Sequence, residues 1–417
     1  MSANDDGPPW LLLAGVWLIY GAFGLVAASL APLVGSIVTE LNISHSAMGS
    51  VMGAWQLVYI GAAIPCGMLL DRLPSRWALL LGALLVAASA LGRSLAEGYW
   101  TLLLAVMLFG LGGPIISVGA PKVIAQHFTG HHRGLAMGIY ITGPALGGVV
   151  CLTLTHSLLL PLFDQNWRLV LQLWAGFAVA AGLVWFALAS RHRSNSVRIL
   201  KVQQDLATTT EVPALSVRQL LRLPAVRLVM LMSVGVFFIN HGLNNWLPEL
   251  LRNKGMSAEA AGYWAALPIL VGIAGSLLIP RFATPQRRFA ILASLCVAAL
   301  LACLLLLSTA TAMSFGLLLQ GIARSSLMTV LILTLVELPG IGDRNAGTAS
   351  GLFFSAAEVG GMLGPLSLGV VYDLTHGFSA GLYALAAVAA ALALSVARLQ
   401  RMARADPAQA RTTDLPA

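Results

Sequence analysis

The stretch Gly67-Met-Leu-Leu-Asp71-Arg72-Leu-Pro74-Ser-Arg76 is a short charged connection between two long apolar runs. The flanking runs, residues 46–70 and 76–94, each approach the roughly 20 apolar residues that a helix needs to cross a hydrocarbon core about 30 Å thick. A basic loop between two such runs is typical of a chain that crosses a membrane and turns back at the cytoplasmic surface. The same alternation of apolar runs and polar punctuation continues in both directions.

The composition agrees with a membrane protein. Of 417 residues, 24 are basic and 16 acidic, so that 10% are charged while 58% are apolar. A soluble globular domain has about a quarter of its residues charged. These values exclude a soluble enzyme, a disordered scaffold and a nucleic-acid-binding protein. In a membrane protein the net charge of +8 reflects where the loops lie rather than a polyanionic partner.

Twelve apolar runs are long enough to span a bilayer. They cover residues 10–38, 46–70, 76–94, 99–126, 133–160, 167–190, 224–248, 259–280, 287–308, 312–336, 346–372 and 377–397. The long polar stretch 191–222 separates two sets of six. We therefore predict an all-α membrane protein with 12 transmembrane helices in two pseudo-symmetric six-helix bundles, residues 1–190 and 223–400. A cytoplasmic linker, 191–222, joins them, and a cytoplasmic tail, 401–417, follows.

The placement of basic residues predicts the orientation. With both termini cytoplasmic, 18 of the 24 Lys and Arg residues lie in inner loops and tails, as the positive-inside rule requires. The N-terminal residues Met1–Pro9 contain Asp5 and Asp6 and no basic residue. The following run therefore reads as a retained span and not as a cleaved signal peptide. We expect a multi-pass protein of the cell (inner) membrane with both termini in the cytoplasm.

Small-residue motifs recur in the two halves. Gly134-Leu-Ala-Met-Gly138 returns as Gly347-Thr-Ala-Ser-Gly351, an offset of 213 residues, and the same offset carries Gly147-Gly148 onto Gly360-Gly361. Such residues let helix backbones approach closely in lipid, where apolar packing gives no hydrophobic gain. Packing alone explains the motifs, but the shared register also favours duplicated bundles, a common transporter architecture.

Two of these stretches resemble motifs of the major facilitator superfamily. The 67–76 loop resembles its G-x-x-x-D-R-x-G-x-R signature, with Pro74 in place of a glycine, and Gly143-Pro144-Ala-Leu-Gly147-Gly148 is similar to its Gly-Pro motif. The resemblance implies a twelve-helix transporter that works by rocking the two bundles about a central site. It also implies a cytoplasmic gate at Asp71, Arg72 and Arg76. The second copy of the loop, near Arg287 and Arg288, lacks the acidic residue.

A further string resembles the cyanate and nitroimidazole transporter group of that superfamily. It runs from Trp246-Leu247-Pro248 through Leu251, Gly255 and Ser257 to Ala261-Gly262, and Gly92-Arg93, Pro121 and Phe128 also fit. The group implies small organic or inorganic anions, or small neutral amphipathic solutes, as cargo.

Two ionisable residues fall near the middle of predicted spans. Arg324 lies about twelve residues into 312–336 and Glu358 about twelve into 346–372, and charges at this depth mark functional sites. The residues 213 positions earlier, Leu111 and Ala145, are uncharged. The two charges therefore occur only in the second half. Either the two pair and neutralise each other, or Arg324 anchors a substrate anion through its planar fork of donors. Glu358 would then take up a proton and compete with substrate for the arginine.

Polar and aromatic residues extend the candidate site. Gln320 lies one helical turn before Arg324, while Asn240 and Asn244 share a face of span 224–248 with His241 beside them. Interhelical hydrogen bonding explains the amides at least as well as substrate contact does. His241 could be a second proton site, but a structural role explains it better. Tyr20, Gln56, Tyr59 and Tyr140 are candidates to line the cavity, although aromatic residues also gather at membrane interfaces. Lys122 is expected to snorkel toward the inner surface, with a gate role as the alternative.

The sequence shows no motif for ATP-driven transport, enzyme catalysis or metal binding. There is no G-x-x-x-x-G-K-S/T loop for ATP, no set of nucleophile, base and orienting residue, and no metal spacing among the four cysteines. The cluster His127, His131 and His132 reads as a solvated loop rather than a metal site. We expect no enzyme activity, cofactor or metal. The expected partners are a small-molecule substrate, protons and the bilayer, with the chain acting as a monomer.

The function predicted from these observations is proton-coupled uptake of a small organic anion, such as a carboxylate, by alternating access. The alternative is proton-driven efflux of amphipathic drugs or metabolites, which the antiporter-like Gly143-Pro144 motif favours. Against efflux, Gly110 is preceded four residues earlier by Val106 and not by the arginine usual in exporters, and span 10–38 holds no acidic residue.

Overall fold

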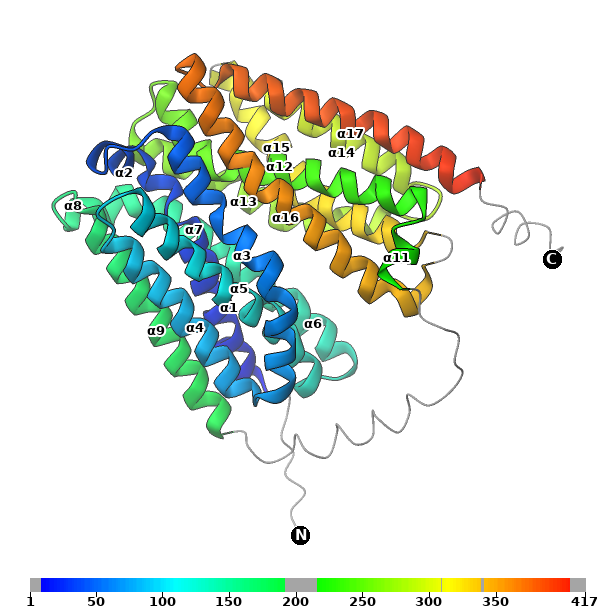
Figure 1. The fold of residues 1–417 in the computed structure, drawn as a ribbon, viewed down its shortest axis with the longest axis horizontal. Coiled ribbons are helices and arrows are strands. Elements are labelled where there is room, and N and C mark those ends of the chain that lie inside the picture. Colours follow the sequence, from blue (N-terminus) through cyan, green and yellow to red (C-terminus); the bar gives the residue numbers. More distant parts are fainter. Residues whose placement is uncertain (1–8, 192–215, 309, 339–340, 406–417) are drawn as a thin grey trace, which may run out of the picture. The chain divides into compact units, whose positions relative to one another are not determined.

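A computed structural model describes residues 9–191, 216–308, 310–338 and 341–405 (Figure 1). Within these ranges every regular element is helical. The first eight residues, most of the predicted linker 191–222 and the end of the predicted tail 401–417 lie outside the described residues. The tail's first residues, 401–405, continue the last helix, Ser379–Ala405.

Within each half of the described chain the helices follow one another with short connections. In unit order they begin with α1 (Trp10–Ala28), η1 (Ala31–Leu33), α2 (Val34–Glu40), α3 (His45–Arg72), α4 (Ser75–Ser94), α5 (Tyr99–His127), α6 (Gly130–Tyr140), α7 (Thr142–Leu154), η2 (Thr155–Leu159), α8 (Leu160–Leu162) and α9 (Trp167–Arg191). They continue with α11 (Val217–Leu220), α12 (Pro224–Asn253), α13 (Ala258–Leu278), η3 (Ile279–Phe282), α14 (Arg288–Leu305), α15 (Ala310–Val336), α16 (Gly342–Thr375) and α17 (Ser379–Ala405).

Twelve helical segments of the described chain are long and apolar enough to cross a membrane. They coincide with the twelve predicted runs to within a few residues at most ends, so the predicted fold class is confirmed. Two segments are interrupted. The first bends through η1 at Pro32, and the fifth contains a π-helical turn, η2, an insertion that commonly bends a helix.

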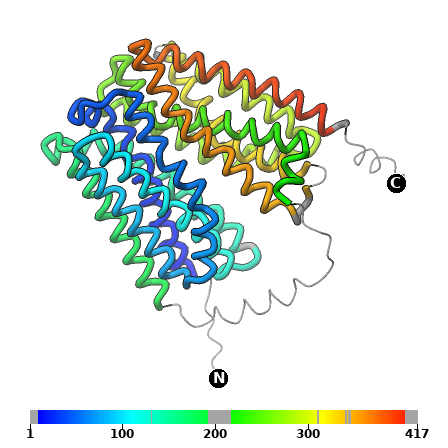
Figure 2. Tube along the Cα trace, in the orientation of Figure 1, coloured from blue at the N-terminus to red at the C-terminus, as the bar shows by residue number. Residues whose placement is uncertain are grey.

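The chain forms two compact units (Figure 2). Unit 1 contains residues 1–43 and 54–212, and unit 2 contains residues 44–53 and 213–417. The division falls inside the predicted linker. One short segment departs from the predicted bundles, because residues 44–53 at the start of α3 belong to unit 2 while the rest of α3 belongs to unit 1.

In unit 1 the tightest helix crossing joins α1 to α7. A Cβ atom added at Gly147 would lie 2.1 Å from the carbonyl oxygen of Gly21, and one at Gly24 would lie 2.1 Å from that of Pro144. No side chain fits at such distances. Glycine is therefore required here for the two backbones to approach, which is the main source of close helix packing in lipid.

Unit 2 repeats this crossing between α12 and α16. A Cβ at Gly360 would lie 1.9 Å from the carbonyl oxygen of Val234, and one at Gly364 would lie 2.3 Å from that of Phe238. Gly360 is Gly147 shifted by 213 residues, and Val234 is Gly21 shifted by the same number. The offset found in the sequence thus relates both partners of the contact, and the two crossings have matching geometry.

The other repeated glycines behave differently. A Cβ at Gly134, Gly138, Gly347 or Gly351 would have no described atom within 4 Å beyond the helix's own backbone. Packing is therefore not the role of these four in this structure. These four glycines belong to the sequence repeat. Only the repeated pair Gly147 and Gly360, however, lies against the backbone of a neighbouring helix.

The start of α3 packs onto α16 within unit 2. A Cβ at Gly49 would lie 2.4 Å from the carbonyl oxygen of Pro365, and one at Gly53 would lie 2.6 Å from that of Met362. The later part of the helix contributes Ala62, Cys66 and Leu70 to a buried apolar cluster of unit 1. A single continuous helix thus contributes to the cores of both units.

A carboxylate from α16 caps this first turn of α3. Asp373 accepts hydrogen bonds from the backbone N–H groups of His45 (3.1 Å) and Ser46 (2.8 Å), which have no partner within the helix. The positive end of the helix dipole favours this negative charge. The ring of His45 lies 4.0 Å from that of Tyr372 and 5.7 Å from that of Trp246.

The glycine contacts predict which Gly→Ala substitutions lower the stability of the protein and which do not. Gly147→Ala and Gly360→Ala force a methyl group into a backbone carbonyl, and overpacking of this kind costs about 1–3 kcal/mol. Gly134→Ala and Gly347→Ala lie on exposed helix surface, where alanine is the better helix former, and should leave stability unchanged or raise it by up to about 1 kcal/mol. Thermal unfolding of the purified protein in detergent measures the difference, and equal melting temperatures for all four variants would contradict the packing argument.

Candidate functional site

Arg324 is held in place by contacts on both sides of α15. The side-chain amide of Asn240, on α12, donates to the carbonyl oxygen of Arg324 at 2.9 Å. On the other side, the hydroxyl group of Ser325 donates to the carbonyl oxygen of Gly272, on α13, at 2.6 Å, and Gly321 lies against the backbone of Pro268. These contacts fix the rotation of α15 about its axis and with it the direction of the Arg324 side chain.

A narrow pocket inside unit 2 adjoins this arginine. Three helices line it, with Val236, Ile239, Asn240 and Leu243 from α12, Ala299 and Ala302 from α14, and Gln320, Ala323, Arg324 and Leu327 from α15. Arg324 is the one charged side chain in this lining. Its Nη1 atom is shielded from solvent and has no hydrogen-bond partner among the described residues.

Among the described residues, Glu358 forms no ion pair with Arg324. Its side chain on α16 is 7% exposed, and its Oε2 atom has no hydrogen-bond partner in the described part of the chain. Mutual neutralisation, one of the two interpretations of the sequence, is therefore not what the structure shows, and both groups are buried without an ionic partner.

The amide cluster of α12 divides into two roles. Asn240 makes the interhelical bond to α15, whereas the Asn245 amide donates to the carbonyl oxygen of His241 within the same helix, at 2.9 Å. The ring of His241 lies 5.4 Å from that of Phe237. Asn244 is half-buried on the same helix. Interhelical hydrogen bonding thus accounts for one of these residues.

The aromatic candidates lie in unit 1. The rings of Tyr20 and Tyr140 stack at 5.5 Å with an interplanar angle of 12°, which brings α1 and α6 together. The hydroxyl groups of Tyr59 and Ser117 are hydrogen-bonded at 2.8 Å. Gln56 is fully buried. Ring contacts run from Tyr20 through Phe23, Phe109 and Trp55 to Tyr59, so the three predicted tyrosines belong to one aromatic cluster.

The predicted gate residues have an unexpected partner. Lys122, on α5, donates to the carboxylate of Asp71 at 2.7 Å and to the carbonyl oxygen of Leu70 at 2.8 Å. Lys122 therefore forms an ion pair and also caps the last turn of α3. Arg72 is exposed, and the guanidinium of Arg76 lies 6.0 Å from the ring of Trp77.

The second half does supply an acidic partner for its copy of this loop. Arg288, only 4% exposed at the start of α14, forms an ion pair with Glu337 just beyond the end of α15. The loop itself contains no acidic residue, unlike that of the first half. The partner instead comes from the segment just after α15, 49 residues later.

Sequence reasoning also missed a buried arginine in unit 1. Arg93, at the end of α4, is 1% exposed, and its Nη1 atom donates to the carbonyl oxygen of Val26 (2.7 Å) and to the hydroxyl group of Ser29 (3.1 Å). A cation at the C-terminus of α1 is favoured by the helix dipole. The Gly92-Arg93 pair fitted the family resemblance, but its place near the end of span 76–94 gave no indication that the arginine is buried.

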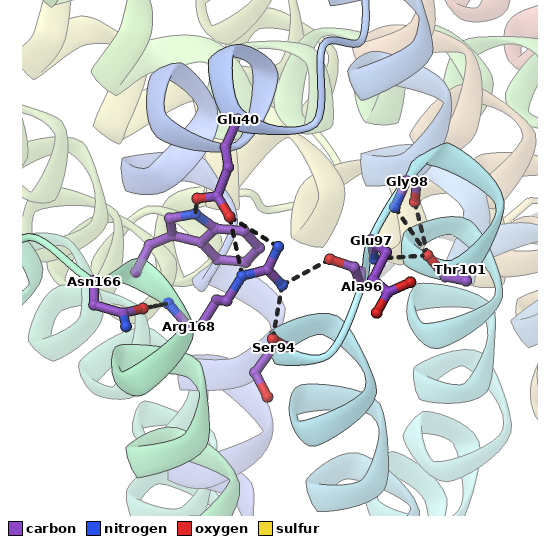
Figure 3. Close-up of polar contacts among 9 residues, drawn as sticks. Glu40, Ser94, Ala96, Glu97, Gly98, Thr101, Asn166 and Arg168 are labelled. Carbon is purple, nitrogen blue, oxygen red and sulfur yellow. Dashed lines mark hydrogen bonds and ion pairs between the residues drawn. The ribbon is translucent and has the colours of Figure 1, made fainter.

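Arg168 binds three helix ends of unit 1 (Figure 3). Its guanidinium donates to Glu40 at 2.9 Å and 3.1 Å, and to the carbonyl oxygens of Ser94 at 2.9 Å and Ala96 at 2.6 Å. The indole N–H of Trp167 also donates to Glu40. The ends of α2 and α4 are thereby held to the start of α9.

Histidines and cysteines contribute no metal cluster. In the described part of the chain, no group of three or more His, Cys, Asp or Glu side chains is arranged to hold an ion. His127 bonds the carbonyl oxygen of Val123 at 2.9 Å, and the ring of His132 lies 6.0 Å from that of Trp10. The side chain of His131 is outside the described residues. All four cysteines are free and buried.

Twelve candidate spans in two units, with a buried arginine beside a pocket, are typical of membrane transport proteins. The family model of the Major Facilitator Superfamily matches residues 16–365. The chain belongs to this superfamily.

Relatives with curated names are transporters. An uncharacterized transporter of Bacillus subtilis (strain 168), YycB, is 26% identical over 87% of this chain and 88% of its own length. The quinolone resistance transporter of Acinetobacter baumannii is 26% identical, covering 84% of both chains. The probable L-galactonate transporter of Escherichia coli (strain K12) is 25% identical over 88% of this chain and 84% of its own.

Solved structures share the fold. The nucleoside transporter NupG, as a D323A mutant, superposes with a TM-score of 0.74 at 12% identity, covering 93% of this chain and 99% of the other. A D-xylose–proton symporter gives 0.70 at 15% identity, covering 94% and 97%. At these identities the likeness concerns the fold alone.

The Arg168 cluster predicts an order of effects on stability. Arg168→Ala removes the bonds to Glu40 and to two backbone carbonyls, whereas Glu40→Gln keeps its shape and weakens only the ionic contact. Because hydrogen bonds to charged groups contribute about 1.5–3 kcal/mol, Arg168→Ala should lower the melting temperature clearly more than Glu40→Gln. A double-mutant cycle gives their coupling, and an equal loss in both single variants would refute the carbonyl contribution.

Proposed function

We propose that this chain is a secondary transporter that takes up a small organic anion together with protons, with Arg324 as the anchor for the anion. The observation that supports it most is the shielded Nη1 donor of Arg324 in a pocket without a carboxylate. A buried charge without a counter-ion is costly. A substrate carboxylate supplies that charge, and the planar guanidinium matches its geometry with two parallel bonds.

Glu358 is the proposed proton carrier. A carboxyl group buried without a partner is accommodated as the neutral acid more readily than as an anion. Loss of that proton leaves a carboxylate that competes with the substrate for the guanidinium of Arg324. Proton binding and substrate binding then support each other, which is the requirement for symport by alternating access.

The names of the relatives support an anionic cargo, and one of them supports an alternative function. Their names include a probable L-galactonate transporter and a hexuronate transporter of Bacillus subtilis (strain 168), both for sugar acids. The quinolone resistance transporter supports the second candidate, efflux of amphipathic drugs or metabolites. Within the superfamily we assign the chain to the cyanate and nitroimidazole transporter group, on the Trp246-Leu247-Pro248 string. Trp246 is fully buried and donates to the carbonyl oxygen of Pro365 at 2.8 Å.

The proposal also covers the orientation of the chain in the membrane, its oligomeric state and its other substrate contacts. With both termini on the cytoplasmic side of the cell (inner) membrane, 18 of 24 basic residues lie inside, and the gate residues Asp71, Arg72 and Arg76 lie at the inner surface. The chain acts as a monomer. The remaining predicted substrate contacts are His241 and Asn244 in unit 2 and Tyr20, Gln56, Tyr59 and Tyr140 in unit 1.

Uptake into proteoliposomes tests the anchor. With a panel of carboxylates and an imposed pH gradient, acid outside, the protein should accumulate anion inside. Arg324→Gln should abolish this uptake, and Arg324→Lys should reduce it by roughly tenfold or more, since the ammonium keeps the charge but loses the planar fork. Arg227→Lys, exposed on α12, is the matched control. Full activity in Arg324→Gln would sink the anion proposal, and expulsion of substrate would establish efflux.

Glu358→Gln tests the coupling separately. The amide mimics the neutral acid but cannot release a proton, so accumulation driven by the pH gradient should disappear while substrate counterflow continues. Glu259→Gln, at an exposed position in the first turn of α13, is the control and should keep both activities. Persisting pH-driven accumulation in Glu358→Gln would show that the proton travels elsewhere.

A further inference from the structure

The pocket beside Arg324 is the size of a single water molecule. Its volume is about 10 Å³, and a cavity needs roughly 10–15 Å³ to hold one buried water. A carboxylic acid is larger than this, so in the conformation described the pocket is closed to the proposed substrate. Whatever binds inside the pocket in this conformation is therefore no larger than water.

Two side chains of α15 bring unsatisfied polar atoms to this pocket. Gln320 is 4% exposed, and neither its Nε2 nor its Oε1 atom has a hydrogen-bond partner among the described residues. The same holds for the Nη1 atom of Arg324, one helical turn later and on the same face of the helix. Buried polar groups are almost always hydrogen-bonded, so these atoms require a partner.

The pocket itself supplies at most one further polar group. Apart from Gln320, Arg324 and Asn240, its lining consists of apolar residues, namely Val236, Ile239, Leu243, Ala299, Ala302, Ala323 and Leu327. The amide nitrogen of Asn240 already donates to the carbonyl oxygen of Arg324. Its side-chain oxygen is left as a hydrogen-bond acceptor.

One water molecule matches these groups in hydrogen bonding as well as in size. Its oxygen can accept from the Nη1 atom of Arg324, and its O–H groups can donate to the side-chain oxygens of Gln320 and Asn240. Buried waters make about three hydrogen bonds of this kind. A halide ion could also accept from Arg324, but it is larger than water and is repelled by the amide oxygens.

We propose that this pocket is a binding site for one water molecule, held between Arg324 and Gln320. The water restores part of the hydration that the guanidinium group loses on burial, and an unsolvated charge in an apolar lining is costly. Unit 2 can thus keep a charged arginine in a pocket whose lining holds no carboxylate. The water site does not depend on whether Arg324 also binds an anion during transport.

X-ray footprinting of the purified full chain tests the site in solution, because radiolysis of a bound water produces hydroxyl radicals that oxidise the nearest side chains. Leu243 and Leu327 line the pocket and are 1% and 3% exposed. Mass spectrometry should find both oxidised. Leu331 and Leu335, fully buried on α15 and outside the lining, are the internal controls and should stay unmodified.

Two substitutions remove the water in different ways, so that the test survives if one variant fails to fold. Gln320→Leu deletes the polar atoms of the amide, and Ala302→Val fills the pocket. Each should reduce the oxidation of the two lining leucines severalfold. The matched controls Gln172→Leu, exposed on α9, and Ala290→Val, exposed on α14, should keep the wild-type level.

A structure determined at a resolution that shows waters tests the site directly. It should contain an oxygen atom at about 2.7–3.2 Å from both the Nη1 atom of Arg324 and the Oε1 atom of Gln320. A pocket without such density overturns the proposal. So does anomalous scattering from bromide at this position after soaking, which would identify an anion site, and so does leucine oxidation that is unchanged in both pocket variants.

Discussion

The contact between glycine backbones on α1 and α7, and its copy between α12 and α16, is the constraint on which the rest of each unit depends. In lipid the helices gain little from apolar burial against one another, so their association relies on close packing and on interhelical hydrogen bonds. At Gly147 and Gly360 the approach is so close that the partner helix cannot rotate or slide without steric overlap. That restriction sets the face that each packed helix turns toward its own unit, including α12, which carries Asn240 to the backbone of Arg324.

Within that scaffold the arginines of the two units differ in the partners of their terminal nitrogen atoms. In unit 1, Arg93 and Arg168 are directed at backbone carbonyls where helices end, so their donors stabilise the chain itself. In unit 2, Arg288 has an acidic partner, but Arg324 keeps a shielded donor with no partner among the described residues. The Nε atoms of Arg93 and Arg288 are also shielded and without a partner, so Arg324 differs from them in that its terminal Nη1 donor, and not only an Nε atom, has no partner among the described residues.

The sequence predicts the parts of this structure that depend on local composition. Twelve spans follow from hydropathy, and Arg324 and Glu358 stand out because charge at that depth is unfavourable in lipid. Contacts that depend on the rotation of neighbouring helices could not be predicted in this way. The partners Lys122 of Asp71 and Glu337 of Arg288 come from other helices, and spacing along one segment carries no information about them. Gly134 and Gly147 belong to equally convincing motifs, yet only Gly147 touches a neighbour.

The continuity of α3 has a consequence for how the polypeptide could be divided. A cut in the stretch between α9 and α11 would yield two fragments of six spans each, but the second would lack residues 44–53 of its own compact unit. Asp373 would lose the N–H groups that it caps, and the backbone groove at Pro365 and Gly369 would lose the helix that fills it. The C-terminal fragment on its own would therefore lack part of its core, and that part is encoded in the N-terminal fragment.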